Sequence, residues 1–189
     1  SQGYKYKWGQ TFTDHMLSID YTLENGWAKP QIIPYGPMKF ATTAMCLHYG
    51  MSAYEGSMIV KNIETDSPQA FRLDETLKSF QDSCEHLDLP LFDATELIPC
   101  LKELINLDKD WFPEFDDGTP SQLNIRMTHL GVDRELGIRT PKQSRIFAIV
   151  NPTSLVRKTI SIQCTSNVYK NWPLGHGSFR VAGNLGPLM

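Results

Sequence analysis

The stretch AFRLDETLKSFQDSCEHLDLPLFDATELIPCLKELINLDKDWFP, residues 70–113, decides the fold of this chain. In its first part, apolar residues recur at spacings of three and four, at Leu77, Phe80, Cys84 and Leu87. This period predicts an amphipathic helix, which we expect Asp74 to cap and Pro90 to end.

A second helix is predicted in the remainder of the same stretch. Asp93 and Glu96 have the spacing of a capping box. Apolar residues follow at helical intervals, at Leu97, Leu101, Leu104 and Ile105. Pro99 lies inside this pattern and lacks the N–H that a helix interior needs, so we expect a late start or a kink.

Strand patterns lie on both sides of the two helices. The predicted strands are 11–22, which ends before the Asn25-Gly26 turn, and 31–36, 38–61, 70–73, 122–131, 145–151 and 159–165. Residues 114–121 are predicted to form a loop. Strands, then two helices, then strands again indicate an α+β fold rather than an alternating α/β fold.

The composition is that of an ordinary globular protein, with 41% apolar and 21% charged residues in 189. No apolar run approaches the roughly 20 residues of a membrane span, and no secretory segment is recognisable. The net charge of −3 gives no reason to expect nucleic-acid binding. The chain starts at Ser1, so we expect a processed or trimmed chain.

Charge is distributed unevenly along the chain. Residues 1–119 carry 9 Lys and Arg against 19 Asp and Glu, a balance of −10, whereas residues 120–189 carry 9 against 2, a balance of +7. Such asymmetry can mark an anionic partner, but we favour the interpretation that the two regions pack together in one fold.

The cysteines give no sign of a disulfide framework or a metal site. Cys46, Cys84, Cys100 and Cys164 are far apart, and no CxxC is present. We therefore expect free thiols in a reducing compartment and no bound metal.

Glycines are dense in GHGSFRVAGNLG, residues 175–186, where Arg180 is the single permanent cation. Glycine lets the backbone approach a ligand or another segment closely. A lone cation in such a stretch suggests that the side chain is directed at a partner.

Several segments, taken in order, carry a resemblance to a known family. They are WGQTFTDHMLSIDY (8–21), NGWAKPQIIPY (25–35), CLHYGMSAYEG (46–56), residues 70–113, LNIRMTHLG…ELGIR (123–139) and SFRVAGNLG (178–186). Together they resemble the eukaryotic branched-chain-amino-acid aminotransferases, fold-type IV enzymes that use pyridoxal phosphate. The resemblance covers almost the whole chain.

The resemblance implies a domain organisation. Residues 1–152 would form the small domain of a class IV aminotransferase, an antiparallel sheet with two helices. Residues 153–158 would be a shortened linker, and 159–189 the opening strands of an incomplete larger domain. The family's chains continue well past this point, so we expect other protein subunits to cover the incomplete domain, with a homodimer as a further option.

Arg180 falls on the lysine of the family's K-x-G-G-N-Y-G motif, whose Gly183 and Asn184 are kept. The family's lysine holds the cofactor covalently, as an internal aldimine, and moves a proton during the reaction. A guanidinium group stays protonated and has no free amine lone pair, so it can do neither. The resemblance therefore implies a catalytic position that has lost its chemistry.

Three further positions differ from the family at residues that line its cofactor and substrate pocket. Ser79 stands where the resemblance places the phosphate-binding arginine, Leu185 where it places the tyrosine of the NYG motif, and Asn124 where it places a pocket tyrosine. Four changes around one ligand lead us to expect that the chain binds no cofactor.

Other pocket positions remain. Arg126 matches the family's arginine on the carboxylate side of the pocket, and Tyr49 and Tyr54 match aromatic positions. With Arg180 and Asn124 they are candidates for a residual anion or substrate pocket. Packing roles are the alternative for these residues.

Three functions remain open at this point. The leading hypothesis is a catalytically silent pseudoenzyme that serves as a structural or accessory subunit of a larger assembly, in mitochondria or alternatively in the cytoplasm. The second is an active branched-chain aminotransferase that uses pyridoxal phosphate, with the other half of the fold supplied elsewhere. The third is a binding module for anions or small molecules in the old cofactor cleft.

Overall fold

The computed structural model describes residues 6, 9–114, 121–153, 159, 161–164, 166 and 169–188. Its strands are β1 (His15–Thr22), β2 (Gly26–Trp27), β3 (Gln31–Pro34), β4 (Ser52–Lys61), β5 (Pro68–Ala70), β6 (Gln122–Gly131) and β7 (Gln143–Thr153). Its helices are α1 (Met45–His48), α2 (Leu73–His86) and α3 (Ala94–Leu107), with 3-10 turns η1 (Lys109–Trp111) and η2 (Ala182–Leu188).

The strands form one antiparallel sheet in the order β2-β1-β7-β6-β4-β5, and β3 pairs with β1 on the same edge as β2. The longest pairing joins β6 to β7, from Gln122 opposite Thr153 to Gly131 opposite Ser144. Buried and partly exposed residues alternate along both strands, which is the period of a sheet covered on one face.

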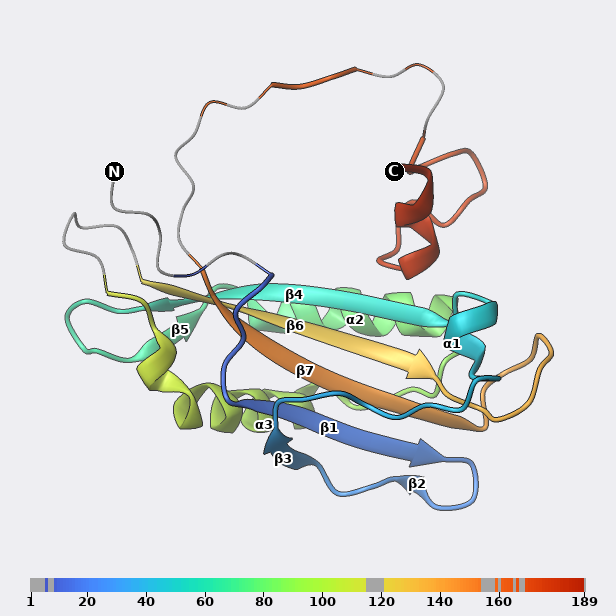
Figure 1. Cartoon of the computed structure of the whole chain (residues 1–189), viewed down its shortest axis with the longest axis horizontal. Helices are drawn as coiled ribbons and strands as arrows, with labels where there is room; N and C mark the ends of the chain where they lie inside the picture. The colour runs from blue at the N-terminus through green and yellow to red at the C-terminus, as the bar shows by residue number, and fades with distance from the viewer. Residues whose placement is uncertain are drawn as a thin grey trace.

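Helices α2 and α3 cover one face of the sheet and pass behind the strands in Figure 1. The core between the layers includes Leu77 and Phe80 of α2, Leu101 and Leu104 of α3, and Ile125 of β6. The two helices expected from the apolar period are therefore confirmed, as is the α+β fold with an antiparallel sheet.

The helix starts agree only partly with expectation. Asp93 is the N-cap of α3, and its carboxylate accepts a hydrogen bond of 2.8 Å from the backbone N–H of Thr95. The late start expected from Pro99 is wrong, because α3 begins at Ala94 and contains the proline. Asp74 is not a cap: α2 begins at Leu73, after Arg72, whose φ of 48° lies in the left-handed region.

Three predicted strand boundaries are also wrong. Residues 45–48 form α1, and Gly50, with φ of +65°, turns the chain before β4 begins at Ser52. The strand expected at 70–73 is β5, which ends at Ala70 because the chain turns into α2. The described residues of 159–165 form no strand.

Other expectations fall partly outside the described residues. They are most of the loop at 114–121 and of the linker at 153–158. The division into 1–152, 153–158 and 159–189 stays a prediction. No helix in the described ranges combines the length and apolarity needed to cross a membrane.

His129 of β6 is buried between the sheet and α2. Its Nε2 lies 2.9 Å from the Ser144 hydroxyl, and its Nδ1 lies 3.4 Å from Cys84 Sγ. Burial lowers the pKa of His129 to about 3 and raises the pKa of the Cys84 thiol. The histidine is therefore neutral in the folded protein near neutral pH.

The burial of His129 predicts a loss of stability in mild acid. Its pKa of about 3 in the folded protein lies below the value of about 6.5 in an unfolded chain, so the unfolded chain binds the proton first. The free energy of unfolding should fall by about 1.4 kcal/mol per unit between about pH 6 and about pH 4. Urea titrations of the wild type and His129→Gln would measure this. Equal pH slopes for the two proteins would show that His129 is not held neutral.

Asp93 and Asp74 form a matched pair for testing helix capping. Asp93→Ala removes the hydrogen bonds to Thr95, whereas Asp74→Ala removes only a carboxylate from the first turn of α2. We expect Asp93→Ala to lower the free energy of unfolding more, in urea titrations followed by circular dichroism.

The capping effect also has a pH dependence. The hydrogen bonds to Thr95 hold the pKa of Asp93 below its usual value. The stability that these bonds contribute is therefore fully present above the pKa of an unfolded aspartate, which is about 4. It is lost as the pH falls below that value. The difference in the free energy of unfolding between wild type and Asp93→Ala should therefore narrow as the pH falls below about 4. A larger effect from Asp74→Ala would contradict the assignment of the cap.

Candidate functional site

The segment that carries Arg180 is fixed by its backbone to both layers of the fold. The Arg180 carbonyl accepts a hydrogen bond of 2.9 Å from the N–H of Tyr54, and the Arg180 N–H donates to the Ser83 hydroxyl at 3.0 Å. Val181 forms an isolated antiparallel bridge with Ala53. Arg180 is therefore placed where the start of β4 meets α2, two residues before η2 begins at Ala182.

Asn184 holds the glycine-rich stretch in shape. It is only 1% exposed, and its side-chain amide donates to the carbonyls of His176, at 2.7 Å, and Phe179, at 3.0 Å. The Phe179 ring stacks on His86 of α2 with centroids 3.8 Å apart, and His86 Nε2 lies 2.6 Å from His176 Nδ1. Partial burial and the neighbouring His176 lower the pKa of His86.

Glu55 is the partner of Arg180. This residue of β4 is 5% exposed, and its Oε1 lies 3.2 Å from Arg180 Nε and accepts a hydrogen bond of 3.0 Å from the N–H of Gly56. Its Oε2 accepts a hydrogen bond of 2.8 Å from the Ser79 hydroxyl. Arg180 and Ser79, two predicted site residues, thus bind one buried carboxylate.

A cavity of about 380 Å³ opens beside this cluster. Its described lining residues are Glu55, Gly56, Phe71, Arg72, Glu75, Thr76, Ser79 and Arg180, none of which is a lysine. Arg72 Nη2 lies 2.9 Å from Glu75 Oε1 in an exposed ion pair. The left-handed backbone of Arg72 is uncommon for a residue with a side chain, and such conformations cluster at functional sites.

The remaining pocket candidates of β4 and β6 lie on the other face of the sheet. Arg126 Cζ lies 4.0 Å from the centroid of the Tyr54 ring, and the Asn124 amide donates to Met58 Sδ at 3.3 Å. Strand alternation separates this group from Glu55, which faces α2. Arg126 does not line the cavity that Arg180 lines, so the structure does not bring the two arginines into one pocket.

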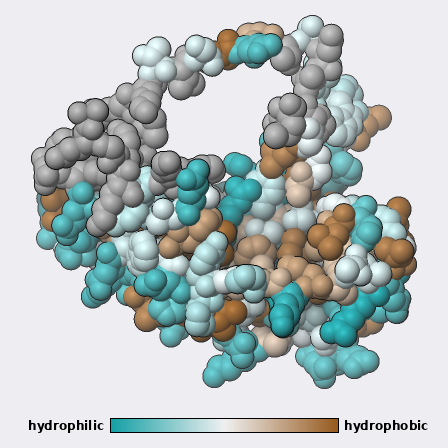
Figure 2. All heavy atoms as spheres, in the orientation of Figure 1, coloured by the Kyte–Doolittle hydropathy of each residue, from teal (hydrophilic) through white to brown (hydrophobic). Residues whose placement is uncertain are grey.

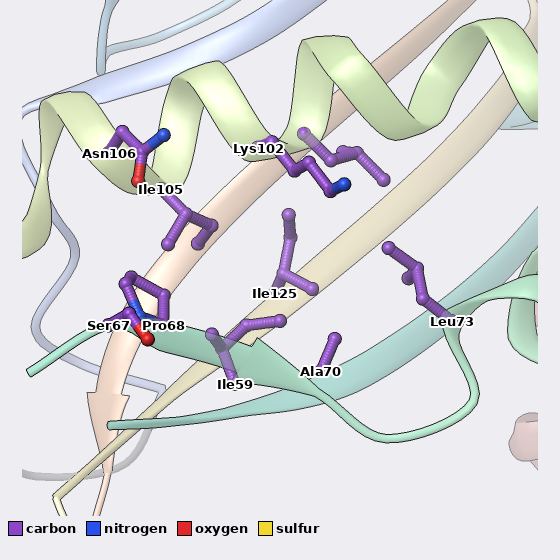
Figure 3. Close-up of a pocket in the computed structure, with 10 residues that line it drawn as sticks. Ile59, Ser67, Pro68, Ala70, Leu73, Lys102, Ile105, Asn106 and Ile125 are labelled. Atoms are coloured by element: carbon purple, nitrogen blue, oxygen red, sulfur yellow. The ribbon is translucent and has the colours of Figure 1, made fainter. Parts of the chain in front are cut away.

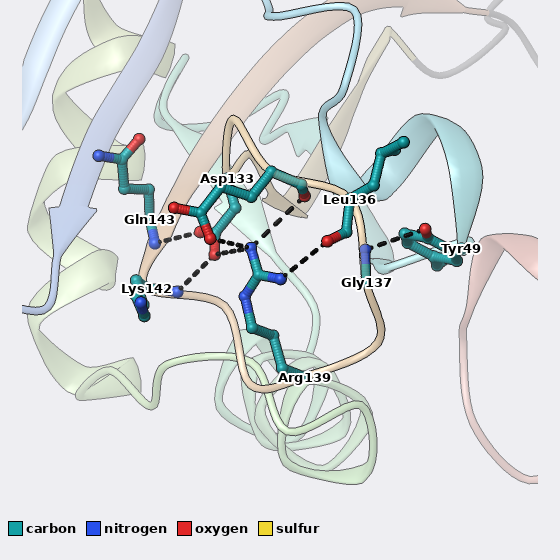
Figure 4. A network of polar contacts seen from close by, with 8 residues as sticks. Tyr49, Asp133, Leu136, Gly137, Arg139, Lys142 and Gln143 are labelled. Atoms are coloured by element: carbon teal, nitrogen blue, oxygen red, sulfur yellow. Dashed lines mark hydrogen bonds and ion pairs between the residues drawn. The ribbon is translucent and has the colours of Figure 1, made fainter.

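Tyr49 and Leu185 also lie apart from the cavity. The Tyr49 hydroxyl accepts a hydrogen bond of 2.9 Å from the N–H of Gly137, in the loop between β6 and β7 (Figure 4). Asp133 orders the same loop, because its carboxylate accepts hydrogen bonds from the N–H groups of Lys142 and Gln143 and from Arg139. Leu185 is exposed on η2.

Glu55 and Arg72 were not among the site residues predicted from the sequence. A signal for Glu55 was present, because it is a lone acid at an inward-facing position of a strand, and such a charge needs a partner. Arg72 had no such signal. No group of three potential metal ligands is found among the described residues.

Comparisons with known proteins agree on one family. No protein-family model matches the chain. The cytosolic branched-chain-amino-acid aminotransferase of Mus musculus is 30% identical over 183 residues, which cover 94% of this chain and 46% of the relative. The cytosolic and mitochondrial enzymes of Saccharomyces cerevisiae are each 32% identical over 183 residues, covering 48% and 46% of their own lengths. The chain thus spans about half the length of these relatives.

Solved structures share the fold. The T.th. branched-chain amino acid aminotransferase, in complex with 4-methylvaleric acid, matches 94% of this chain and 53% of its own, with a TM-score of 0.65 and 19% identity. The Escherichia coli enzyme matches 75% of this chain and 40% of its own, with a TM-score of 0.57 and 19% identity.

The expectation that the chain binds no cofactor is contradicted by these comparisons. Two of the T.th. structures hold pyridoxamine 5'-phosphate and N-(5'-phosphopyridoxyl)-L-glutamate, so the neighbours point to a cofactor rather than to none. The expectation rested on lost contacts at Ser79, Arg180 and Leu185. The structure nevertheless has a cavity beside α2 that is lined by Arg72 and Arg180.

The relatives carry cytosolic and mitochondrial names alike, so they are compatible with either compartment. With 30% or more identity to several relatives over more than nine-tenths of its residues, and with the same fold in the solved neighbours, the chain is a homologue of the branched-chain-amino-acid aminotransferases, matched over about half of their length.

Proposed function

We propose that this chain is a catalytically silent homologue of the branched-chain aminotransferases that serves as a structural or accessory subunit of a larger assembly. The observation that carries the proposal is Arg180, whose guanidinium group pairs with Glu55 at the position that resembles the family's lysine. A guanidinium group stays protonated near neutral pH, so it neither condenses with an aldehyde nor accepts a proton there.

The cleft fits a cofactor of the pyridoxal phosphate class in a non-covalent form. Its cavity of about 380 Å³ is in the size range of small-molecule sites. When bound, a cofactor of this class supplies an electron sink for chemistry at the amino-acid carbon. Arg72 and the Nη groups of Arg180 would hold its phosphate, whereas the single hydroxyl proton of Ser79 is already donated to Glu55. The ion pair of Arg72 with Glu75 is exposed on both sides and therefore weak, so Arg72 can exchange partners readily.

The described lining of the cleft offers no substitute for the lysine amine. Lys170 is ten residues before Arg180 in the sequence, but it does not line the cavity. The two carboxylates that line the cleft already have partners. Glu55 binds Ser79 and Arg180, and Glu75 binds Arg72. The residues that could bind and orient a cofactor are therefore present, and an amine that moves the proton is not.

The accessory role is supported by the open face of the sheet. Neither α2 nor α3 covers this face, since both lie behind the strands in Figure 1, and Figure 2 shows apolar residues interspersed among polar ones across it. Leu47, Tyr49 and Met58 are exposed apolar or aromatic residues of α1, its C-cap and β4. Other subunits, or a second copy of the chain, would cover such residues.

The compartment that we propose is the mitochondrion. Relatives from Saccharomyces cerevisiae and Schizosaccharomyces pombe carry mitochondrial names and match 95% and 96% of this chain. Fractionation of cells that produce the chain would test this part, and recovery in the cytosol alone would overturn it.

Restoring the amine tests the catalytic part of the proposal. Pyridoxal phosphate followed by borohydride should leave no pyridoxyl group in the cleft of the wild type, whereas Arg180→Lys should gain one at position 180, because only the variant has an amine there. Peptide mapping by mass spectrometry measures both. Lys170→Met is the matched control and should change neither result.

Two outcomes would contradict catalytic silence. One is a stoichiometric pyridoxyl group on Lys170 of the wild type, and the other is transfer of the leucine amino group by the wild type. If neither occurs, visible absorption and equilibrium dialysis with pyridoxamine 5'-phosphate report whether the cleft binds the cofactor non-covalently.

The accessory role predicts an assembly well above the mass of one chain, which is 21.5 kDa. Native mass spectrometry of the chain isolated from its source should give complexes of at least twice that mass, and the partner masses separate a homodimer from a mixed assembly. Recovery only as a 21.5 kDa monomer would overturn the role.

A further inference from the structure

A second cavity, of about 240 Å³, lies between α3 and the strands β4, β5 and β6 (Figure 3). It shares no lining residue with the cleft beside Arg180. It is therefore a separate cavity on the side of the sheet that α2 and α3 cover.

The walls of this cavity are apolar. Ile59 of β4, Ile125 of β6, and Leu101 and Ile105 of α3 line it, and all four belong to the buried core. Ala70 lines it as well, and its small side chain leaves space at the end of β5. Apolar cavities of about 150 Å³ stay dry and accept a molecule the size of benzene, so this larger one can accept an aliphatic chain.

The rim carries one uncommitted cation. Lys102 and Asn106 stand one turn apart on α3 and project from it beside the apolar walls (Figure 3). Lys102 forms no ion pair or hydrogen bond with another described residue, whereas Lys61 on β4 pairs with Asp66 at 2.6 Å. The described lining contains no carboxylate. An ammonium group and an amide above an apolar hollow match an anionic head on an apolar tail.

We propose that this cavity binds a small aliphatic monocarboxylate, with the tail among Ile59, Ile105 and Ile125 and the carboxylate on Lys102. A monocarboxylate of about six carbons in all suits its volume. A second charge would have no partner among the lining residues, and a neutral head would forgo the interaction with the ammonium group. The inference concerns a site apart from the cleft and does not depend on the proposed function.

The isoleucine methyl groups offer a direct test. The full chain, labelled with ¹³C at its isoleucine methyls, would be titrated with hexanoate and observed by NMR. The signals of Ile59, Ile105 and Ile125 should shift saturably, with a Kd near about 1 mM. Ile19 and Ile146 lie in the core but do not line the cavity, so their signals should stay in place.

Four variants separate the contribution of the Lys102 charge to binding from that of the apolar cavity. Lys102→Met should weaken hexanoate binding by about tenfold and leave 1-hexanol binding unchanged, because only the charge-assisted interaction is lost. Lys109→Met removes a lysine that does not line the cavity and should change neither. Ala70→Phe should fill the cavity and abolish both. Arg180→Met, in the cleft, should leave the hexanoate response unchanged.

Each alternative result overturns the proposal. Unmoved signals of the three lining isoleucines at about 20-fold the expected Kd would exclude binding. Equal binding of hexanoate by wild type and Lys102→Met would show that Lys102 does not bind the carboxylate and that only the apolar walls contribute. Loss of the response in Arg180→Met, with the Ile19 and Ile146 signals still those of the folded protein, would place the ligand in the cleft. If Ala70→Phe fails to fold, as the Ile19 and Ile146 signals report, the Lys102→Met comparison decides.

Discussion

The buried carboxylate of Glu55 is the constraint on which the site depends. A charge that is 5% exposed cannot be left unpaired without a large desolvation cost, and here it is bonded to Ser79, Arg180 and its neighbour's N–H. These bonds join β4, α2 and the segment after residue 169. At the two positions where the resemblance implies a lysine and an arginine for the cofactor, Arg180 and Ser79 both bond to this carboxylate.

The pairing of Glu55 with Arg180 also explains part of the charge asymmetry. The acidic balance of residues 1–119 and the basic balance of residues 120–189 meet in ion pairs such as Arg180 with Glu55 and Arg145 with Asp20, where Arg145 Nη2 lies 3.0 Å from Asp20 Oδ2. Charges that look segregated along the sequence are thus neighbours across the sheet. This supports the interpretation that the two regions pack in one fold.

Local patterns predicted the two long helices and the main strands because their periods depend on near neighbours. The apolar spacing of Leu77 and Phe80 is enough to identify α2, and Asp93 is enough to start α3. The partners of Arg180 were beyond such patterns, because Glu55 is 125 positions earlier and only the sheet topology brings it near. The same holds for Arg126, whose distance from Arg180 follows from strand alternation on β4 and β6.

The bridge between Val181 and Ala53 has a consequence for the solubility of the chain. Strand β5 pairs with β4 only from Ile59 to Lys61, so the N-terminal part of that edge would otherwise present free N–H and carbonyl groups. Residues 180 and 181 cover the start of this edge, at Ala53 and Tyr54. A protease cut before Arg180 would uncover a pairing template, and nicked molecules would then tend to stack edge to edge into aggregates.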